Sequence, residues 1–249
     1  MFKRPSCINI AVPCVAFLLA VYSEYGGLDV WLSRHFYDQG LGVWPYRRHW
    51  LMEDVLHRGG RNLVVALAIL LFLLLIGSFF RPGLKPYRKD FAFVLVAGLS
   101  GPAIVGTFKA LTHIYSPWAL QLFGGNQPYI RIFDHVPANS PVGHAFPAAH
   151  ASGGFAWFSV FFALRRRAIP GYRLSLILPL VLGLFFGAAQ QVRGAHFLSH
   201  DLVSLGICWM CAALWSRLFY ANAPGADING MLSAHSPRSS KDENEILTL

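Results

Sequence analysis

Residues 62–80 form an unbroken apolar run without a charged side chain, and this run limits the possible folds more than any other feature of the sequence. About 20 such residues are the length that an α-helix needs to cross the hydrocarbon core of a bilayer. Only 13% of the 249 residues are charged, whereas soluble domains contain about 25%. Further apolar segments occupy residues 7–22, 91–109, 151–164, 174–190 and 202–219. The sequence therefore predicts an all-α polytopic membrane bundle with six transmembrane helices.

Positive charges are concentrated in two short loops between these segments, residues 81–89 and residues 165–173. Cytoplasmic loops of membrane proteins carry an excess of Lys and Arg, so both loops are expected in the cytoplasm. Six helices then place both termini in the cytoplasm as well. The first helix follows Lys3 and Arg4 and precedes no evident cleavage site, so we expect it to be retained. The expected location is a bacterial inner membrane, with the other helix ends facing the periplasm.

The apolar segments indicate one membrane domain, residues 1–220, followed by a polar tail, residues 221–249, that we expect to be disordered and cytoplasmic. The net charge of +9 reflects the basic loops, and no basic face of the kind that binds nucleic acid is visible. Cys208 and Cys211 have the spacing of half a zinc site, but the second pair of ligands is missing. We therefore interpret them as structural and expect neither a metal nor another cofactor. The sequence does not indicate an oligomeric state.

Residues 193–201 join the last two apolar segments and place several ionisable groups at a predicted membrane boundary. Charge at such a place is costly unless it is paired or faces water, which makes the segment a candidate functional site. Lys109, His150, Arg193, His196 and Asp201 all fall on the same, outer side of the predicted topology. Arginine and lysine bind phosphate, and a neutral imidazole can act as a nucleophile toward phosphorus.

These residues form three segments that resemble the motifs of the type-2 phosphatidic acid phosphatase family, which is related to the vanadium haloperoxidases. Lys109-x6-Ser116-Pro117 is similar to Lys-x6-Arg-Pro, and residues 147–150 (Pro-Ala-Ala-His) are similar to Pro-Ser-Gly-His. The segment that ends in His196 and Asp201 is similar to Ser-Arg-x5-His-x3-Asp. The resemblance covers residues 60–220 in order and spacing.

The resemblance implies a helical bundle that hydrolyses phosphoesters or pyrophosphates without a metal. It implies that His196 is the nucleophile, which forms a phosphohistidine, and that His150 is the general acid. Lys109 and Arg193 would bind the substrate phosphate. The expected partners are membrane lipids and a lipid phosphate or pyrophosphate substrate, hydrolysed at the periplasmic face.

The sequence departs from the family pattern at several positions. Ser116 and Gln190 stand where the motifs have arginine, and Arg193 lies one helical turn after Gln190. His200 stands at the position of the motif's aspartate, one residue before Asp201. Either residue could orient His196, and Asp201 is the interpretation that we favour, especially if Ser199 caps the following helix. Arg131 is an additional, weaker candidate for phosphate binding.

The sequence is also compatible with three other functions. A phosphohistidine could transfer its phosphoryl group to a lipid instead of water, which would make the protein a phosphotransferase. His196-x3-His200 also has the spacing of a histidine box, so a metal-dependent membrane enzyme is a second alternative. The third is a protein without catalytic activity that binds a phospholipid headgroup through Lys109 and Arg193. The loops at residues 24–61 and 113–150 are expected to determine which headgroup is bound.

Overall fold

The computed structural model describes residues 7–221, and these residues form a bundle of α-helices with two isolated β-bridges. The predicted disordered tail lies outside the described residues from position 222 onward. The α-helices are α1 (Cys7–Tyr25), α2 (Leu28–Arg34), α3 (Gly60–Phe80), α4 (Arg88–Leu111), α5 (Ala149–Phe155), α6 (Phe158–Arg166), α7 (Ile177–Val192) and α8 (Leu198–Tyr220). Shorter helical turns are the π-helix η1 (Leu51–Gly59) and the 3₁₀ turns η2 (Pro82–Tyr87), η3 (Pro117–Ala119), η4 (Gln121–Phe123) and η5 (Tyr172–Leu176).

Five helical segments of the described chain are long and apolar enough to cross a membrane. They are Cys7–Tyr25, Leu51–Phe80, Pro82–Leu111, Tyr172–Val192 and Leu198–Tyr220. Each contains one of the apolar runs found in the sequence, which confirms an all-helical membrane architecture. Large apolar side chains such as Leu18, Leu73 and Phe185 are about half exposed on the outside of the bundle, as expected for surfaces that contact lipid.

The remaining apolar segment, residues 151–164, is not one long helix. It is divided into α5 and α6, which are separated by a turn at Ala156 and Trp157. The backbone of α5 approaches α7 so closely that a Cβ atom on Gly154 would lie 2.4 Å from the backbone nitrogen of Gly183. The glycine pair therefore permits the close approach of α5 to α7. A sixth crossing made of α5 and α6, and the cytoplasmic placement of the termini, stay predictions.

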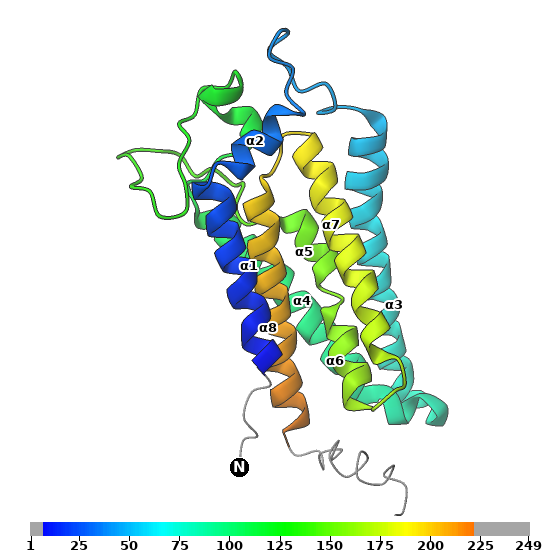
Figure 1. The fold of residues 1–249 in the computed structure, drawn as a ribbon. Helices are drawn as coiled ribbons and strands as arrows, with labels where there is room; N and C mark the ends of the chain where they lie inside the picture. Colours follow the sequence, from blue (N-terminus) through cyan, green and yellow to red (C-terminus); the bar gives the residue numbers. More distant parts are fainter. Residues whose placement is uncertain (1–6, 222–249) are drawn as a thin grey trace, which may run out of the picture.

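Helix α8 lies at the centre of the bundle and contacts α1, α4, α5, α6 and α7 (Figure 1). Gly101 permits the approach of α4, because a Cβ at that position would lie 2.8 Å from the sulfur of Cys208. An aromatic core around Phe93, Phe155 and Trp209 fills the half of the bundle away from the first turn of α8. A second buried cluster, around Trp44, Phe123 and Phe197, covers the other end.

The loops that join the helices at the α2 end extend beyond the helix ends, above and beside α2 (Figure 1). The indole of Trp44 and the rings of Tyr37 and Phe123 pack with centroids 5.3–5.5 Å apart. Residues 24–61 contain the helical pieces α2 and η1, as the sequence predicted for this interfacial segment. These loops surround the first turn of α8, where the predicted site residues lie.

Candidate active site

His196 lies in the short loop between α7 and α8, and the backbone of this loop is held from two sides. Gly194 has a φ of +76°, and a Cβ atom there would lie 2.4 Å from the ring of Trp44. Only glycine fits both the left-handed backbone and the contact. On the other side, the backbone N–H of Trp118 donates to the carbonyl of Gly194 over 2.9 Å. The loop after the first motif is thus attached to the loop of the third.

The imidazole of His200 lies beside that of His196. Their Nδ1 atoms are 3.4 Å apart, and both rings are buried. His200 is in the first turn of α8, and its ring packs edge-on against Phe146 and Phe197 with centroids 5.2 and 5.5 Å away. This aromatic packing fixes the plane of His200. The residue at the position of the family's aspartate is therefore the one that contacts the predicted nucleophile.

Asp201 has a different partner from the one that the sequence analysis favoured. Its Oδ2 accepts a hydrogen bond of 2.6 Å from Nε2 of Gln191 on α7. A Cβ atom on Gly187 would lie 2.4 Å from the same oxygen, so the carboxylate is pressed against the backbone of α7. Ser199 lies inside α8 and is not its N-cap, a position that Phe197 occupies. The regular helix from Leu198 turns Asp201 by about 100° from His200, toward α7.

His150 is at the beginning of α5, and this end of α5 is hydrogen-bonded to the first turn of α8. The backbone N–H of Ala148 donates to the carbonyl of His200 over 3.3 Å, and the hydroxyl of Ser204 donates to the carbonyl of Ala148 over 3.0 Å. The second and third motifs are thereby joined directly. The ring of His150 is half-buried and stacks against His57, with centroids 4.4 Å apart.

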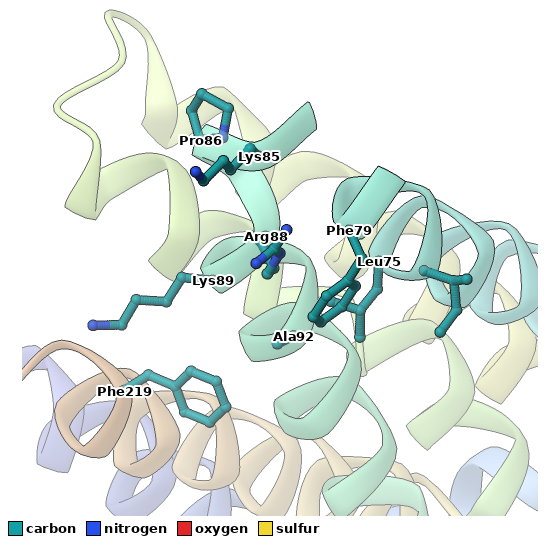
Figure 2. A pocket seen from close by; sticks show the side chains of 9 residues that line it. Leu75, Phe79, Lys85, Pro86, Arg88, Lys89, Ala92 and Phe219 are labelled. Carbon is teal, nitrogen blue, oxygen red and sulfur yellow. The ribbon is translucent and has the colours of Figure 1, made fainter. Parts of the chain in front are cut away.

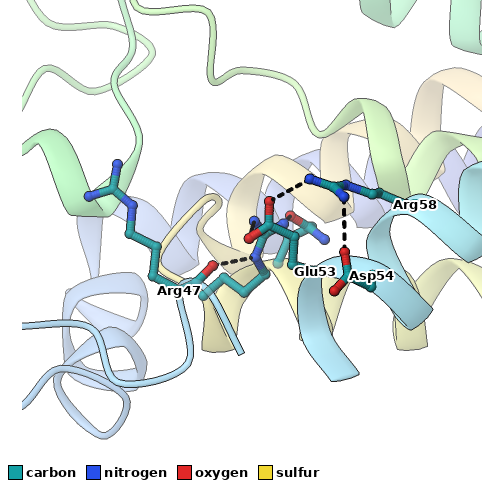
Figure 3. A network of polar contacts seen from close by, with 6 residues as sticks. Arg47, Glu53, Asp54 and Arg58 are labelled. Carbon is teal, nitrogen blue, oxygen red and sulfur yellow. Dashed lines mark hydrogen bonds and ion pairs between the residues drawn. The ribbon is translucent and has the colours of Figure 1, made fainter. Parts of the chain in front are cut away.

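Arg193 follows α7 and is held by three groups from two parts of the chain. Its Nη1 donates to Oε1 of Gln190 over 3.0 Å, and its Nε donates to the carbonyl of Arg47 over 3.0 Å. Its Nη2 lies 3.7 Å from Oε2 of Glu53. Glu53 and Asp54 also pair with Arg58 at 3.4 and 3.0 Å (Figure 3). Gln190, which stands at a motif arginine, thus positions the arginine that lies one turn later.

Lys109 lies in the last turn of α4, and none of the five ion pairs found within residues 7–221 involves it. Its charge acts on His196. The pKa of His196 lies well below its usual value of 6.5, first because the ring is buried and then because positive charge on His200 or Lys109 disfavours protonation. Charge on His150 acts in the same direction. Lys109 and His150 are therefore near enough to His196 for their charges to lower its pKa. His196 is neutral at pH 7.

The π-helix η1 supplies site residues that the sequence analysis did not single out. It carries Glu53 and His57, and the preceding loop carries Arg47, whose guanidinium lies 4.4 Å from the centroid of the Trp118 ring. The wider turn of a π-helix occurs often at functional sites. The interspersed acidic and basic side chains of residues 47–61 indicate an amphipathic segment. Their proximity to the motifs could not be read from sequence spacing.

The other candidates lie apart from this cluster or have structural partners. Arg131 pairs with Asp134 at 2.9 Å and lies over the ring of Tyr25 at the end of α1. Ser116 is half-buried next to η3, and its side chain lacks the guanidinium that the family motif has at this position. Cys208 and Cys211 are buried in the bundle. Within residues 7–221, no three His, Cys, Asp or Glu side chains are grouped as a metal site would require.

A small cavity of about 90 Å³ opens beside His150 between α3, α5 and α7. Its apolar lining includes Val64, Val65 and Phe186, and Arg61 lies at its edge. One of the candidate catalytic rings, that of His150, therefore lines a mainly apolar cavity.

Apolar helices of spanning length around a buried group of imidazoles and cations define an integral membrane protein with a candidate phosphate site. A family model described as the PAP2 superfamily matches residues 90–224, which include all three motif segments. The chain therefore belongs to the PAP2 superfamily, whose members are phosphatases. No curated protein and no solved structure matches the chain. Arg47, Glu53 and His57 lie outside the matched residues.

Proposed function

We propose that the protein is a membrane phosphatase that hydrolyses a lipid phosphate or pyrophosphate at the periplasmic face through a phosphohistidine on His196. The observation that carries the proposal is the hydrogen bond between Ala148 and the carbonyl of His200. It joins the segment that carries His150 to the first turn of α8, which follows His196 and contains His200. In the proposal, the nucleophile His196 and the general acid His150 therefore act on one phosphoryl group.

His196 is the nucleophile of the proposed reaction. With a proton on Nδ1 of His196 donated toward Nδ1 of His200, the lone pair is on Nε2. Nε2 attacks phosphorus, a P–N bond forms, and the P–O bond to the leaving group breaks. The positive charge that develops on His196 is shared with His200, which we propose as the orienting residue. This assigns to His200 the role that the sequence analysis favoured for Asp201.

His150 acts on the leaving group and then on water. Burial lowers the pKa of His150 to about 4, and in the proposal the negative charge of the bound phosphate opposes this shift. His150 is then an imidazolium, which gives a proton to the departing oxygen as the P–O bond breaks. In the second step it takes a proton from water, whose oxygen attacks phosphorus while the P–N bond breaks. Inorganic phosphate leaves, and His196 returns to its neutral form. The contact of 4.4 Å between the His57 and His150 rings supports an orienting role for His57.

Lys109 and Arg193 bind the phosphoryl oxygens in this proposal. Arg193 has five N–H donors, and its Nε and Nη1 already hold it to Arg47 and Gln190, so the remaining donors have a defined direction. Glu53 helps to keep the guanidinium in place through an ion pair of 3.7 Å. An acyl or prenyl chain would leave the site through the apolar opening lined by Val64 and Phe186.

The test is phosphate release by the purified protein from a panel of lipid phosphates. The panel includes phosphatidic acid, phosphatidylglycerol phosphate, undecaprenyl pyrophosphate and lipid A. His196→Ala should lower turnover by at least about 100-fold, and an acid-labile ³²P adduct should form on the unaltered chain but not on His196→Ala. His135→Ala is the matched control, because His135 is an exposed loop histidine. Absence of release from every lipid, or full turnover by His196→Ala, would overturn the proposal.

A further inference from the structure

We propose that the protein binds one anionic phospholipid in a groove at the membrane face opposite the candidate active site. The groove has a volume of about 700 Å³ and is open to the outside of the bundle. It is formed where α3 ends, α4 begins and α8 ends. Its lining consists of Leu75, Ile76, Phe79, Lys85, Pro86, Arg88, Lys89, Ala92 and Phe219.

The position of the groove separates it from the proposed substrate site. Phe219 is next to the last residue of α8, whereas His200 is in the first turn of the same helix. A helix of 23 residues is about 34 Å long at 1.5 Å per residue, which is enough to cross a hydrocarbon core of about 30 Å. A lipid in this groove therefore lies in the other leaflet and cannot be the substrate that reaches His196.

The walls of the groove suit acyl chains. Leu75 and Phe79 line one side and Phe219 lies on the other, with Arg88 between them (Figure 2). Phe79 is 59% exposed and Ile76 is 42% exposed, so the apolar wall on α3 is left uncovered by the protein. A lipid chain along this wall would cover both side chains.

The rim of the groove suits an anionic headgroup. Lys85 and Lys89 are exposed, and neither takes part in an ion pair among the described residues. The nearby carboxylate of Asp90 does not neutralise them, because Arg167 and the hydroxyl of Tyr220 are bonded to it. Basic pockets between helices on the cytoplasmic side are a known way of holding anionic lipids.

Arg88 is held in place by the protein and shapes the floor of the headgroup site. Its Nη2 donates to the carbonyl of Ser78 over 2.5 Å, and its Nε donates to the hydroxyl of Ser78 over 3.2 Å. Its guanidinium lies 3.9 Å from the centroid of the Phe79 ring. Two movable lysines beside a fixed arginine and an apolar wall match a phosphate attached to two acyl chains, and not a zwitterionic headgroup.

Native mass spectrometry of the full chain in detergent tests the proposal with added phosphatidylglycerol or phosphatidylcholine of identical acyl chains. Phosphatidylglycerol should be retained preferentially as one bound molecule. Lys85→Gln with Lys89→Gln should reduce that preference about fivefold for each lysine removed. Arg165→Gln with Arg173→Gln is the matched control, since it removes two positive charges from the other basic loop, and it should keep the preference.

Four outcomes would overturn the proposal. Equal retention of the two lipids by the unaltered chain would remove the basis for a headgroup site. An equal loss in both double variants would show a general effect of charge. Loss of the bound lipid in Lys109→Gln, with retention in the Lys85 and Lys89 variant, would place the lipid at the candidate active site. A preference that appears only after deletion of residues 222–249 would show that the acidic tail, and not lipid, occupies the groove.

Discussion

Oδ1 of Asp29 accepts a hydrogen bond from the backbone N–H of Ser199, 3.1 Å away and 170 residues later in the chain. The hydroxyl of Ser23 donates to the same oxygen over 2.6 Å. Helix α8 has Phe197 at its N-cap, and the side chain of Phe197 has no acceptor for the N–H groups of the first turn. The buried carboxylate of Asp29 on α2 therefore caps the helix that carries His200, and α2 helps to fix the position of the candidate active site.

Replacement of Asp29 should destabilise the protein and disturb the site. Asp29→Ala removes the cap of α8 and should lower stability by about 1 to 2 kcal/mol, the usual cost of a lost N-cap. Thermal unfolding in detergent measures this change. Asp29→Asn keeps an acceptor oxygen and should retain more of the stability. Equal melting temperatures for the alanine variant and the unaltered chain would show that the contact does not stabilise the fold.

Gln190 and Arg193 are expected to act as a pair. Arg193→Gln should lower kcat/KM toward the lipid phosphate by about 10- to 100-fold, because hydrogen bonds to charged groups contribute about 1.5 to 3 kcal/mol. Adding Gln190→Arg should recover part of the loss, since it returns the guanidinium to the position of the family motif. Steady-state phosphate release measures both effects. An exchange variant no better than Arg193→Gln would contradict the idea that Arg193 replaces the motif arginine.

Variants of His200 and Asp201 test which of the two residues orients the nucleophile His196. His200→Phe keeps the aromatic packing but removes the nitrogen that lies 3.4 Å from His196, and it should lower kcat by about 100-fold. Asp201→Asn keeps an oxygen for the hydrogen bond from Gln191 and should have a smaller effect. Turnover under substrate saturation compares the two variants. The reverse order of effects would return the orienting role to Asp201.

The lowered pKa of His196 predicts the acid side of the pH profile. Protonation removes the lone pair that attacks phosphorus, so kcat/KM should fall only at pH values below 6.5, the usual pKa of histidine. The same shift affects stability. The unfolded state binds the proton first, so the contribution of His196 to stability is complete above pH 6.5 and declines as the pH falls below it. A profile whose acid limb has its midpoint above pH 6.5 would contradict this assignment.

Much of the fold could be predicted because lipid imposes simple rules on a chain. Residues 62–80 had to become a spanning helix, because their backbone groups can be satisfied in hydrocarbon only by hydrogen bonds within the segment. The break in residues 151–164 was not predicted. It is accompanied by the contact of Gly154 with the backbone of Gly183, which depends on the position of α7. The apolar composition of these residues does not indicate where α5 contacts α7.

The candidate site, like the fold, could be predicted only in part. The motif order along the chain, together with the family resemblance, predicted that His150, His196, Lys109 and Arg193 belong to one site. It could not show that His200 contacts His196 while Asp201 contacts Gln191, because adjacent residues on a helix point in directions about 100° apart. His57 was missed for a related reason, since its contact with His150 joins residues that are far apart in sequence.

The amino-acid sequence was enough to predict a membrane helical bundle and to propose which motif residues form its site. Both follow from local properties, namely the length of apolar runs and the order of motif residues. Only the tertiary structure decided which groups meet: Asp29 with Ser199, Gln190 with Arg193, and His57 with His150. Each of these contacts depends on how helices and loops pack against one another, and packing is a property of the whole chain.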